Sequence, residues 1–132
     1  MTPKTLEKYF EAKLAAEGGP YDLKHVLDEE KQRWTILDVR SAEDFQKEHI
    51  PGAVNIPLME IEKRWKEISK KTKVFAYCYN ITCHAAPKAA LFLAKKGYTV
   101  RELVGGIAEW KSMQFPVESA TSAPRRHELA GV

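Results

Sequence analysis

Two cysteines near the middle of the chain are the residues best suited to chemistry. Cys78 ends an apolar run, Cys83 follows five residues later, and His84 comes directly after Cys83. A thiolate is both a nucleophile and a metal ligand, and two nearby thiols can form a disulfide. The spacing therefore leaves three chemical uses open for Cys78: nucleophile, half of a disulfide, or metal ligand.

The metal and disulfide alternatives are the weaker ones. Cys-x4-Cys followed by histidine approaches zinc spacing but lacks a second pair of ligands, and His25 and His49 stand alone. Two cysteines without an export signal indicate a reducing cytoplasm in which thiols stay free. Cys78 could also be a small buried hydrophobic residue at a strand end. We expect free thiols, no metal, no other cofactor and a cytoplasmic location.

Composition and charge argue against two classes of partner. The chain has 132 residues, enough for one domain, and a formal net charge of +3 with both signs mixed along it. No concentrated basic face is apparent, so nucleic acid is not an expected partner. The first twenty residues are too charged for a signal peptide, and no later segment approaches the length of a membrane span. A membrane is not expected as a partner either.

Short apolar strands that alternate with helices predict the scaffold that carries the cysteines. Strands are predicted at 35–39, within 50–57, at 73–78 and at 99–104. Helices are predicted at 5–17, after Asp22 and Ser41 as capping residues, at 58–68, around Pro87 and around Trp110. This alternation is typical of an α/β fold with an open, mostly parallel sheet and helices on both faces.

Three segments are expected along the chain. Residues 1–20 form an N-terminal docking helix, whose apolar residues recur at helical spacing, and a Gly-Gly-Pro linker. Residues 21–118 form the α/β domain. Residues 119–132 lack periodicity and are expected to be a flexible C-terminal tail.

The predicted scaffold favours Cys78 as a reactive residue. In an open parallel sheet, ligands bind beyond the carboxyl ends of the strands, and Cys78 ends the third predicted strand. The N-terminus of the following helix offers unpaired N–H groups and the positive end of its dipole, which lower the pKa of a nearby thiol. His84 and Lys88 could add positive charge if they point toward the loop.

Two longer stretches carry a family resemblance. LDVRSAEDFQKEHIPGAVNIP at 37–57 and LVGGIAEWKSMQFPVE at 103–118 resemble the first and last signatures of rhodanese-like domains. Between them, AYC at 76–78 lies where that family keeps its active-site cysteine. The resemblance spans about residues 23–117, in the right order, and is far more specific than any single motif.

The resemblance implies a sulfurtransferase. A cysteine of such a domain takes a sulfane sulfur from a donor, becomes a persulfide and delivers the sulfur to a thiophilic acceptor. It implies that Cys78 is catalytic and that the surrounding loop binds the substrate through Tyr79, Asn80, Ile81, Thr82, Cys83, His84, Ala85 and Lys88. It also implies a fold-supporting polar network of Asp38, Arg40, Glu43 and His49, a tight turn at Gly105-Gly106 and a core anchor at Trp110.

The active-site loop departs from the common family pattern. Common members carry an arginine five positions after the cysteine, whereas position 83 here is a second cysteine, as in some other rhodanese-like proteins. The donor is therefore open among thiosulfate, a persulfide and a polysulfide, and the acceptor is a thiol, a cyanide-like molecule or a protein. Cys83 is either a secondary thiol that attacks a Cys78 persulfide or a packing residue.

Two other functions compete with sulfur transfer. Cysteine phosphatases and arsenate reductases of related architecture carry Cys-x5-Arg, but His84 occupies the arginine position and cannot supply a bidentate planar fork. The nonenzymatic alternative is a rhodanese-like binding or regulatory module. Reactivity of the Cys78 thiol near neutral pH would separate enzyme from module.

Overall fold

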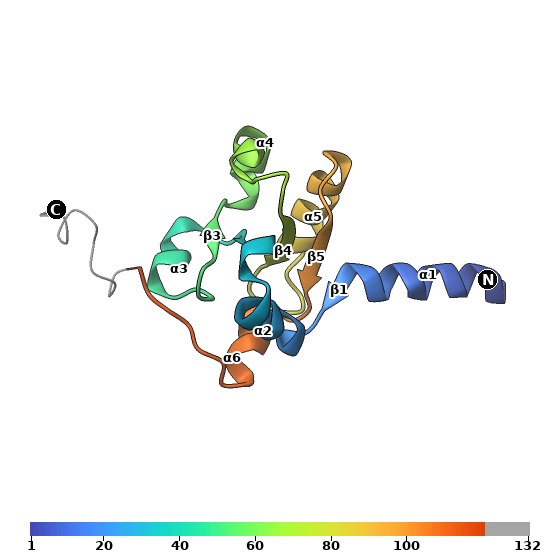
Figure 1. Ribbon diagram of the computed structural model, residues 1–132, viewed down its shortest axis with the longest axis horizontal. Helices are drawn as coiled ribbons and strands as arrows, with labels where there is room; N and C mark the ends of the chain where they lie inside the picture. Colours follow the sequence, from blue (N-terminus) through green and yellow to red (C-terminus); the bar gives the residue numbers. More distant parts are fainter. Residues whose placement is uncertain (121–132) are drawn as a thin grey trace, which may run out of the picture.

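The computed structural model describes residues 1–120, which form a five-stranded sheet with helices on both faces (Figure 1). The strand order is β1-β5-β4-β2-β3, and every neighbouring pair runs parallel. The strands are β1 Glu17–Gly18, β2 Trp34–Asp38, β3 Val54–Asn55, β4 Lys73–Tyr77 and β5 Val100–Leu103. The predicted α/β fold is confirmed, while the two-residue β1 was not predicted because it is too short to show a period.

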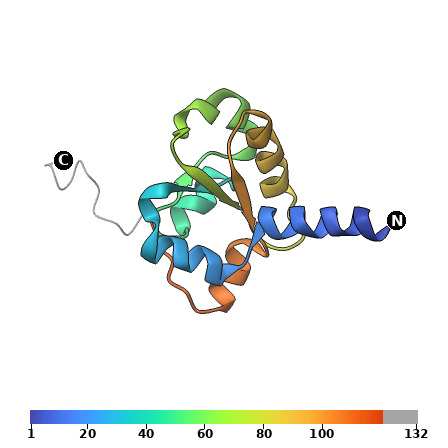
Figure 2. The same ribbon diagram turned by 45° about the vertical axis from the view of Figure 1, so that its right-hand side comes forward.

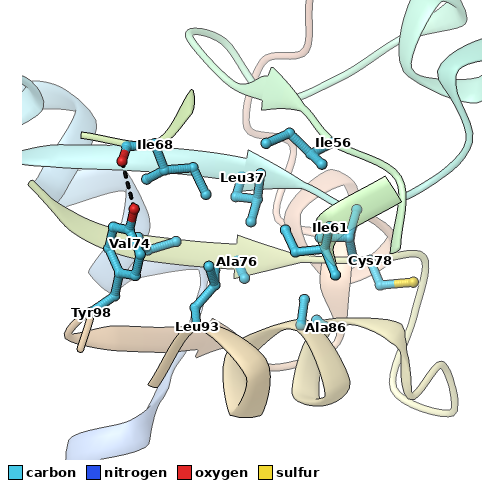
Figure 3. Close-up of a cluster of buried hydrophobic side chains, with 12 residues drawn as sticks. Leu37, Ile56, Ile61, Ile68, Val74, Ala76, Cys78, Ala86, Leu93 and Tyr98 are labelled. Atoms are coloured by element: carbon cyan, nitrogen blue, oxygen red, sulfur yellow. Dashed lines mark hydrogen bonds between the residues drawn. The ribbon is translucent and has the colours of Figure 1, made fainter. Parts of the chain in front are cut away.

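The central strand β4 is buried on both faces, as the apolar run in the sequence requires. Val74 and Ala76 point into one core cluster, together with side chains of α4 Ile61–Arg64 and α5 Ala85–Lys95 (Figure 3). Phe75 and Tyr77 point into a second cluster, with side chains of α2 Pro20–Glu29 and α6 Gly106–Ser112. Trp110 of α6 is fully buried there, as the core anchor expected from the sequence.

Helix ends follow the capping rules, with two corrections. α3 Ala42–Lys47 begins after Ser41, whose Oγ accepts from the backbone N–H of Asp44 at 3.2 Å, so this predicted cap is confirmed. Gly19 caps α2, and Asp22 lies three residues inside it, because Pro20 fits the first helical position, where no N–H is needed. The helix predicted at 58–68 is broken into short turns around α4.

Helix α1 Pro3–Ala16 extends away from the rest of the molecule (Figures 1 and 2). The predicted helix is therefore present, but it does not dock on the domain. None of its residues is buried, and the side chains expected to pack are exposed, up to 75% for Leu14. Only its C-terminal end is tied down, through β1, which pairs with β5.

The described chain ends beside α3. The Ala120 amide donates to the Gln46 carbonyl at 3.1 Å, so the first residues of the expected tail lie against the domain. The rest of that tail, residues 121–132, falls outside the described residues. None of the helices within residues 1–120 is long and apolar enough to cross a membrane.

Candidate active site

Cys78 is the first residue after β4 and is only 3% exposed. Its backbone lies at the carboxyl end of the strand, and its sulfur points past that end, at the margin of the core cluster to which Cys78 belongs (Figure 3). The strand ends one residue earlier than the sequence predicted. The side chain therefore belongs to the loop between β4 and α5, where open parallel sheets bind ligands.

Helix α6 holds the backbone of this loop. The Ile107 amide donates to the Cys78 carbonyl and the Ala108 amide to the Tyr79 carbonyl, each at 3.0 Å. Gly106, with φ 61°, makes this approach possible, because a Cβ there would lie 2.6 Å from the Cys78 carbonyl oxygen. The sequence predicted the turn at Gly105-Gly106 but not its contact with Cys78, which needs the fold to bring the two segments together.

Cys78 and Cys83 are joined by a disulfide, with their Cα atoms 6.4 Å apart. No cysteine among the described residues is free, so the expectation of free thiols is wrong. The loop turns back on itself: the Cys83 amide donates to the Asn80 carbonyl and the Thr82 amide to the Asn80 side-chain oxygen, both at 3.1 Å. This local turn, which the sequence did not reveal, returns Cys83 to Cys78.

The loop amides are divided between internal bonds and open donors. Those of Thr82 and Cys83 are used by Asn80. Those of Ala85 and Ala86, in the first turn of α5, find no acceptor within residues 1–120, as expected at a helix N-terminus. An anion in front of α5 could accept from these two donors.

The two cationic candidates lie on different sides of α5. His84 is exposed and caps α5 through its backbone. It also lies near Glu102. Burial is the main cause that raises the pKa of the Glu102 carboxyl, and His84 acts in the opposite direction. Lys88 is exposed and lines a hollow of about 370 Å³ with Leu58 and Ile61. Neither side chain forms a hydrogen bond or ion pair with the cysteine loop in the described structure.

The buried polar network at the end of β2 is smaller than predicted. Arg40 donates from Nε and Nη2 to both carboxylate oxygens of Asp38, and the Tyr77 hydroxyl donates to Asp38 at 2.7 Å. Tyr77 accepts in turn from the Ile50 amide, and its pKa is raised far above the usual range by burial and then by Asp38. Tyr77 was not among the predicted residues, because its apolar neighbours marked it only as core.

The other two predicted members of that network lie elsewhere. His49 bonds the Phe45 carbonyl at 2.7 Å and the Glu118 carboxylate at 3.1 Å, and so fastens the end of the described chain to α3. Glu43 is exposed in the first turn of α3 and takes no part in the hydrogen bonds of Asp38 and Arg40.

Tyr79 connects the network to the cysteine loop. Its ring centroid lies 5.4 Å from the Arg40 guanidinium carbon, and its hydroxyl donates to Asp44 of α3. Arg40 is itself held by Asp38 and by the Glu48 carbonyl at 2.6 Å. Tyr79, one of the residues predicted to bind substrate, is thus held by a cation near its ring and by a carboxylate at its hydroxyl.

A hollow of about 460 Å³ opens beside the loop. Asn80 and Ile81 line it on one side, and Gly105 and Ala108 of the α6 segment on the other. Ile81 is 71% exposed, so the cysteine loop itself presents an apolar side chain to this hollow. Within residues 1–120, no three His, Cys, Asp or Glu side chains gather closely enough to hold a metal ion.

Comparison with known proteins gives a consistent family match. The rhodanese-like domain family matches residues 20–113. The chain is 38% identical over 93 residues to the HTH-type transcriptional regulator Rv0324 of Mycobacterium tuberculosis, covering 70% of this chain and 40% of the regulator. It is 38% identical over 76 residues to the putative sulfur carrier protein YrkF of Bacillus subtilis, covering 57% of this chain and 40% of that protein. The chain thus spans less than half the length of these two relatives.

Two further similarities cover more of the matched protein. The thiosulfate sulfurtransferase PspE of Escherichia coli is 36% identical over 75 residues, 55% of this chain and 70% of PspE. The crystal structure of the BH2092 protein from Bacillus halodurans superposes with a TM-score of 0.82 at 30% identity, covering 99% of this chain and 100% of that one. The α1 extension therefore lies within the region matched in that structure.

Proposed function

The chain belongs to the rhodanese-like domain family, and from that premise we propose that it is a sulfurtransferase with Cys78 as its nucleophile. It takes a sulfane sulfur from an anionic donor, carries it as a Cys78 persulfide and passes it to a thiophilic acceptor. The similarity to a thiosulfate sulfurtransferase and to a putative sulfur carrier supports this reaction class.

The observation that carries the proposal is the position of Cys78 at the carboxyl end of β4, in front of α5. The open amides of Ala85 and Ala86 and the dipole of this eleven-residue helix favour an anion there. Both the thiolate of Cys78 and its persulfide are anions. The two bonds from α6 hold the backbone at Cys78 and Tyr79 while the Cys78 side chain changes state.

The transfer step is a displacement at sulfur. The reduced Cys78 thiolate attacks the outer sulfur of a donor persulfide, a new S–S bond forms at Cys78, and the donor leaves as a thiolate. With thiosulfate, the same attack expels sulfite. The Cys78–Cys83 disulfide has no nucleophile, so the active form is the dithiol. A reducing compartment, the cytoplasm, maintains that form.

The loop chemistry favours a persulfide or polysulfide over thiosulfate as donor. No arginine or lysine lies between Cys78 and Lys88, and Arg40 is engaged by Asp38 and Glu48. A thiosulfate dianion would have to rely on backbone amides alone, without a charge-assisted clamp. The hollow beside Asn80 and Ile81 would receive the organic part of a donor, a small thiol acceptor or a segment of an acceptor protein.

The proposal is tested by transfer kinetics. Reduced wild type should move sulfur from glutathione persulfide to cyanide, and Cys78→Ser should lose this activity while its circular dichroism spectrum stays unchanged. Cys83→Ser is the matched control, because it removes a thiol from the same loop and should retain transfer to cyanide. Full activity in Cys78→Ser, with none in Cys83→Ser, would transfer the nucleophilic role to Cys83.

A further inference from the structure

We propose that Cys83 is a second catalytic residue that makes this protein a sulfide-releasing persulfide reductase. This inference rests on the proposed function, because it needs a persulfide on Cys78. Cys83 then attacks that persulfide, sulfide leaves, and the disulfide seen in the structure is the product of the step.

The loop geometry places the two sulfurs within bonding reach without moving an element of the fold. The Cα atoms of Cys78 and Cys83 lie 6.4 Å apart, inside the range of ordinary disulfides. Cys78 is fixed by α6 through its carbonyl, and Cys83 is fixed by the turn at Asn80. The loop is thus closed at both ends around the bonded pair.

The step balances without an outside oxidant. The Cys83 thiolate attacks the inner sulfur of the Cys78 persulfide, an S–S bond forms between the two cysteines, and the outer sulfur leaves as hydrosulfide. The persulfide sulfur is reduced to sulfide, and the two cysteines are oxidised to the disulfide. Two equivalents of a thiol reductant then restore both cysteines and become a disulfide themselves.

Differential burial sets the direction of the restoring step. Cys78 is 3% exposed, whereas Cys83 is only partly buried at the loop surface. A reducing thiol therefore reaches the Cys83 sulfur first, and Cys78 is the leaving thiolate. Its charge develops in front of the open amides of α5, which favours this leaving group.

The absence of a cationic side chain from the loop also favours sulfide release. In this loop no side-chain charge holds a persulfide anion on Cys78, and the position of the missing arginine carries the attacking thiol instead. The persulfide is therefore a short-lived intermediate, and sulfide release competes with delivery of the sulfur to an external acceptor. The net reaction consumes one persulfide and two thiols, and yields one thiol, one sulfide and one disulfide.

The test is a single turnover without reductant. Reduced, desalted wild type, Cys83→Ser and Cys78→Ser are mixed with glutathione persulfide, and sulfide is trapped with monobromobimane while intact mass is recorded. Wild type should release about one sulfide per chain above the Cys78→Ser background and lose about two mass units. Cys83→Ser should instead gain about 32 mass units and show no burst. Added dithiothreitol should make wild-type release continuous.

Each other outcome has one meaning. A persulfide on wild type that lasts as long as that on Cys83→Ser overturns the role of Cys83 and leaves sulfur transfer standing. Loss of two mass units without a sulfide burst means that the disulfide arises by ordinary oxidation, which also overturns it. If neither wild type nor Cys83→Ser ever carries or releases the sulfur, the proposed function itself fails.

Discussion

Replacing Gly106 by alanine should displace the cysteine loop. The new Cβ would lie 2.6 Å from the Cys78 carbonyl oxygen, 2.8 Å from the Tyr79 carbonyl carbon and 2.9 Å from the Asn80 nitrogen. All three are backbone atoms and cannot rotate away. The left-handed φ of 61° adds strain for any residue with a Cβ.

The expected loss of stability follows from these two effects. The left-handed conformation costs about 1–2 kcal/mol and overpacking against the fixed backbone about 1–3 kcal/mol, so Gly106→Ala should lower the free energy of unfolding by about 2–5 kcal/mol. Ordinary domains are stable by about 5–15 kcal/mol, so the variant should stay folded in water unless the loss reaches the upper end of the expected range. The rate of sulfur transfer should fall even for the molecules that remain folded, because the substitution moves the Cys78 backbone.

The assay is urea unfolding of the reduced protein, with Gly52→Ala as the matched control. Gly52 also has a positive φ, 82°, but its added Cβ would meet only the flexible end of Lys31 at 3.3 Å. The difference between the two variants isolates the collision with the loop, about 1–3 kcal/mol. Equal losses for Gly106→Ala and Gly52→Ala, with unchanged transfer by both, would refute the view that α6 sets the position of the loop.

Three further predictions concern single side chains. Tyr77→Phe leaves the buried Ile50 amide without its acceptor and removes one of the donors to Asp38, so urea unfolding should show a loss of about 1–3 kcal/mol; a loss near zero would contradict this. The pKa of Glu102 is raised above 4.5, chiefly by burial and next by the charge of Glu17. The protonated form of Glu102 therefore contributes its full stability below pH 4.5, and this contribution is lost as the pH rises through the folded-state pKa. Glu102→Gln should therefore stabilise the protein at pH 7 but not at pH 4, and equal effects at both would contradict the shift. Cys83→Arg should supply the missing cation and lower the KM for thiosulfate about tenfold or more relative to Cys83→Ser, since a charge-assisted hydrogen bond contributes about 1.5–3 kcal/mol; an unchanged KM would contradict the assignment.

The scaffold was predictable because its signals are local. Short apolar runs bounded by turns marked four of the five strands, and Ser41 marked the start of α3. β1 was missed because two residues carry no period, and only pairing with β5 defines it. The exposure of α1 could not be predicted either, since apolar spacing in a helix does not say whether a surface is there to receive it.

The sequence predicted where the candidate site lies but not the contacts that hold it together. Cys78 was placed at a strand end by its apolar run and by family resemblance, and the structure sets it one residue beyond the strand. The disulfide depends on the turn at Asn80, and the hold on the loop depends on Gly106. Both are contacts that arise from three-dimensional placement. The expectation of free thiols rested on the cysteine count and on the absence of an export signal, and neither reports on these contacts.

The most direct test of sulfur transfer through Cys78 is to locate the transferred sulfur atom. Reduced Cys83→Ser and Cys78→Ser should be treated with glutathione persulfide, alkylated at once, digested and examined by peptide mass spectrometry. We predict that Cys83→Ser carries an alkylated persulfide on Cys78, about 32 mass units heavier than the alkylated thiol, and that Cys78→Ser carries none on Cys83. A persulfide on Cys83 together with an unmodified Cys78 would contradict the account.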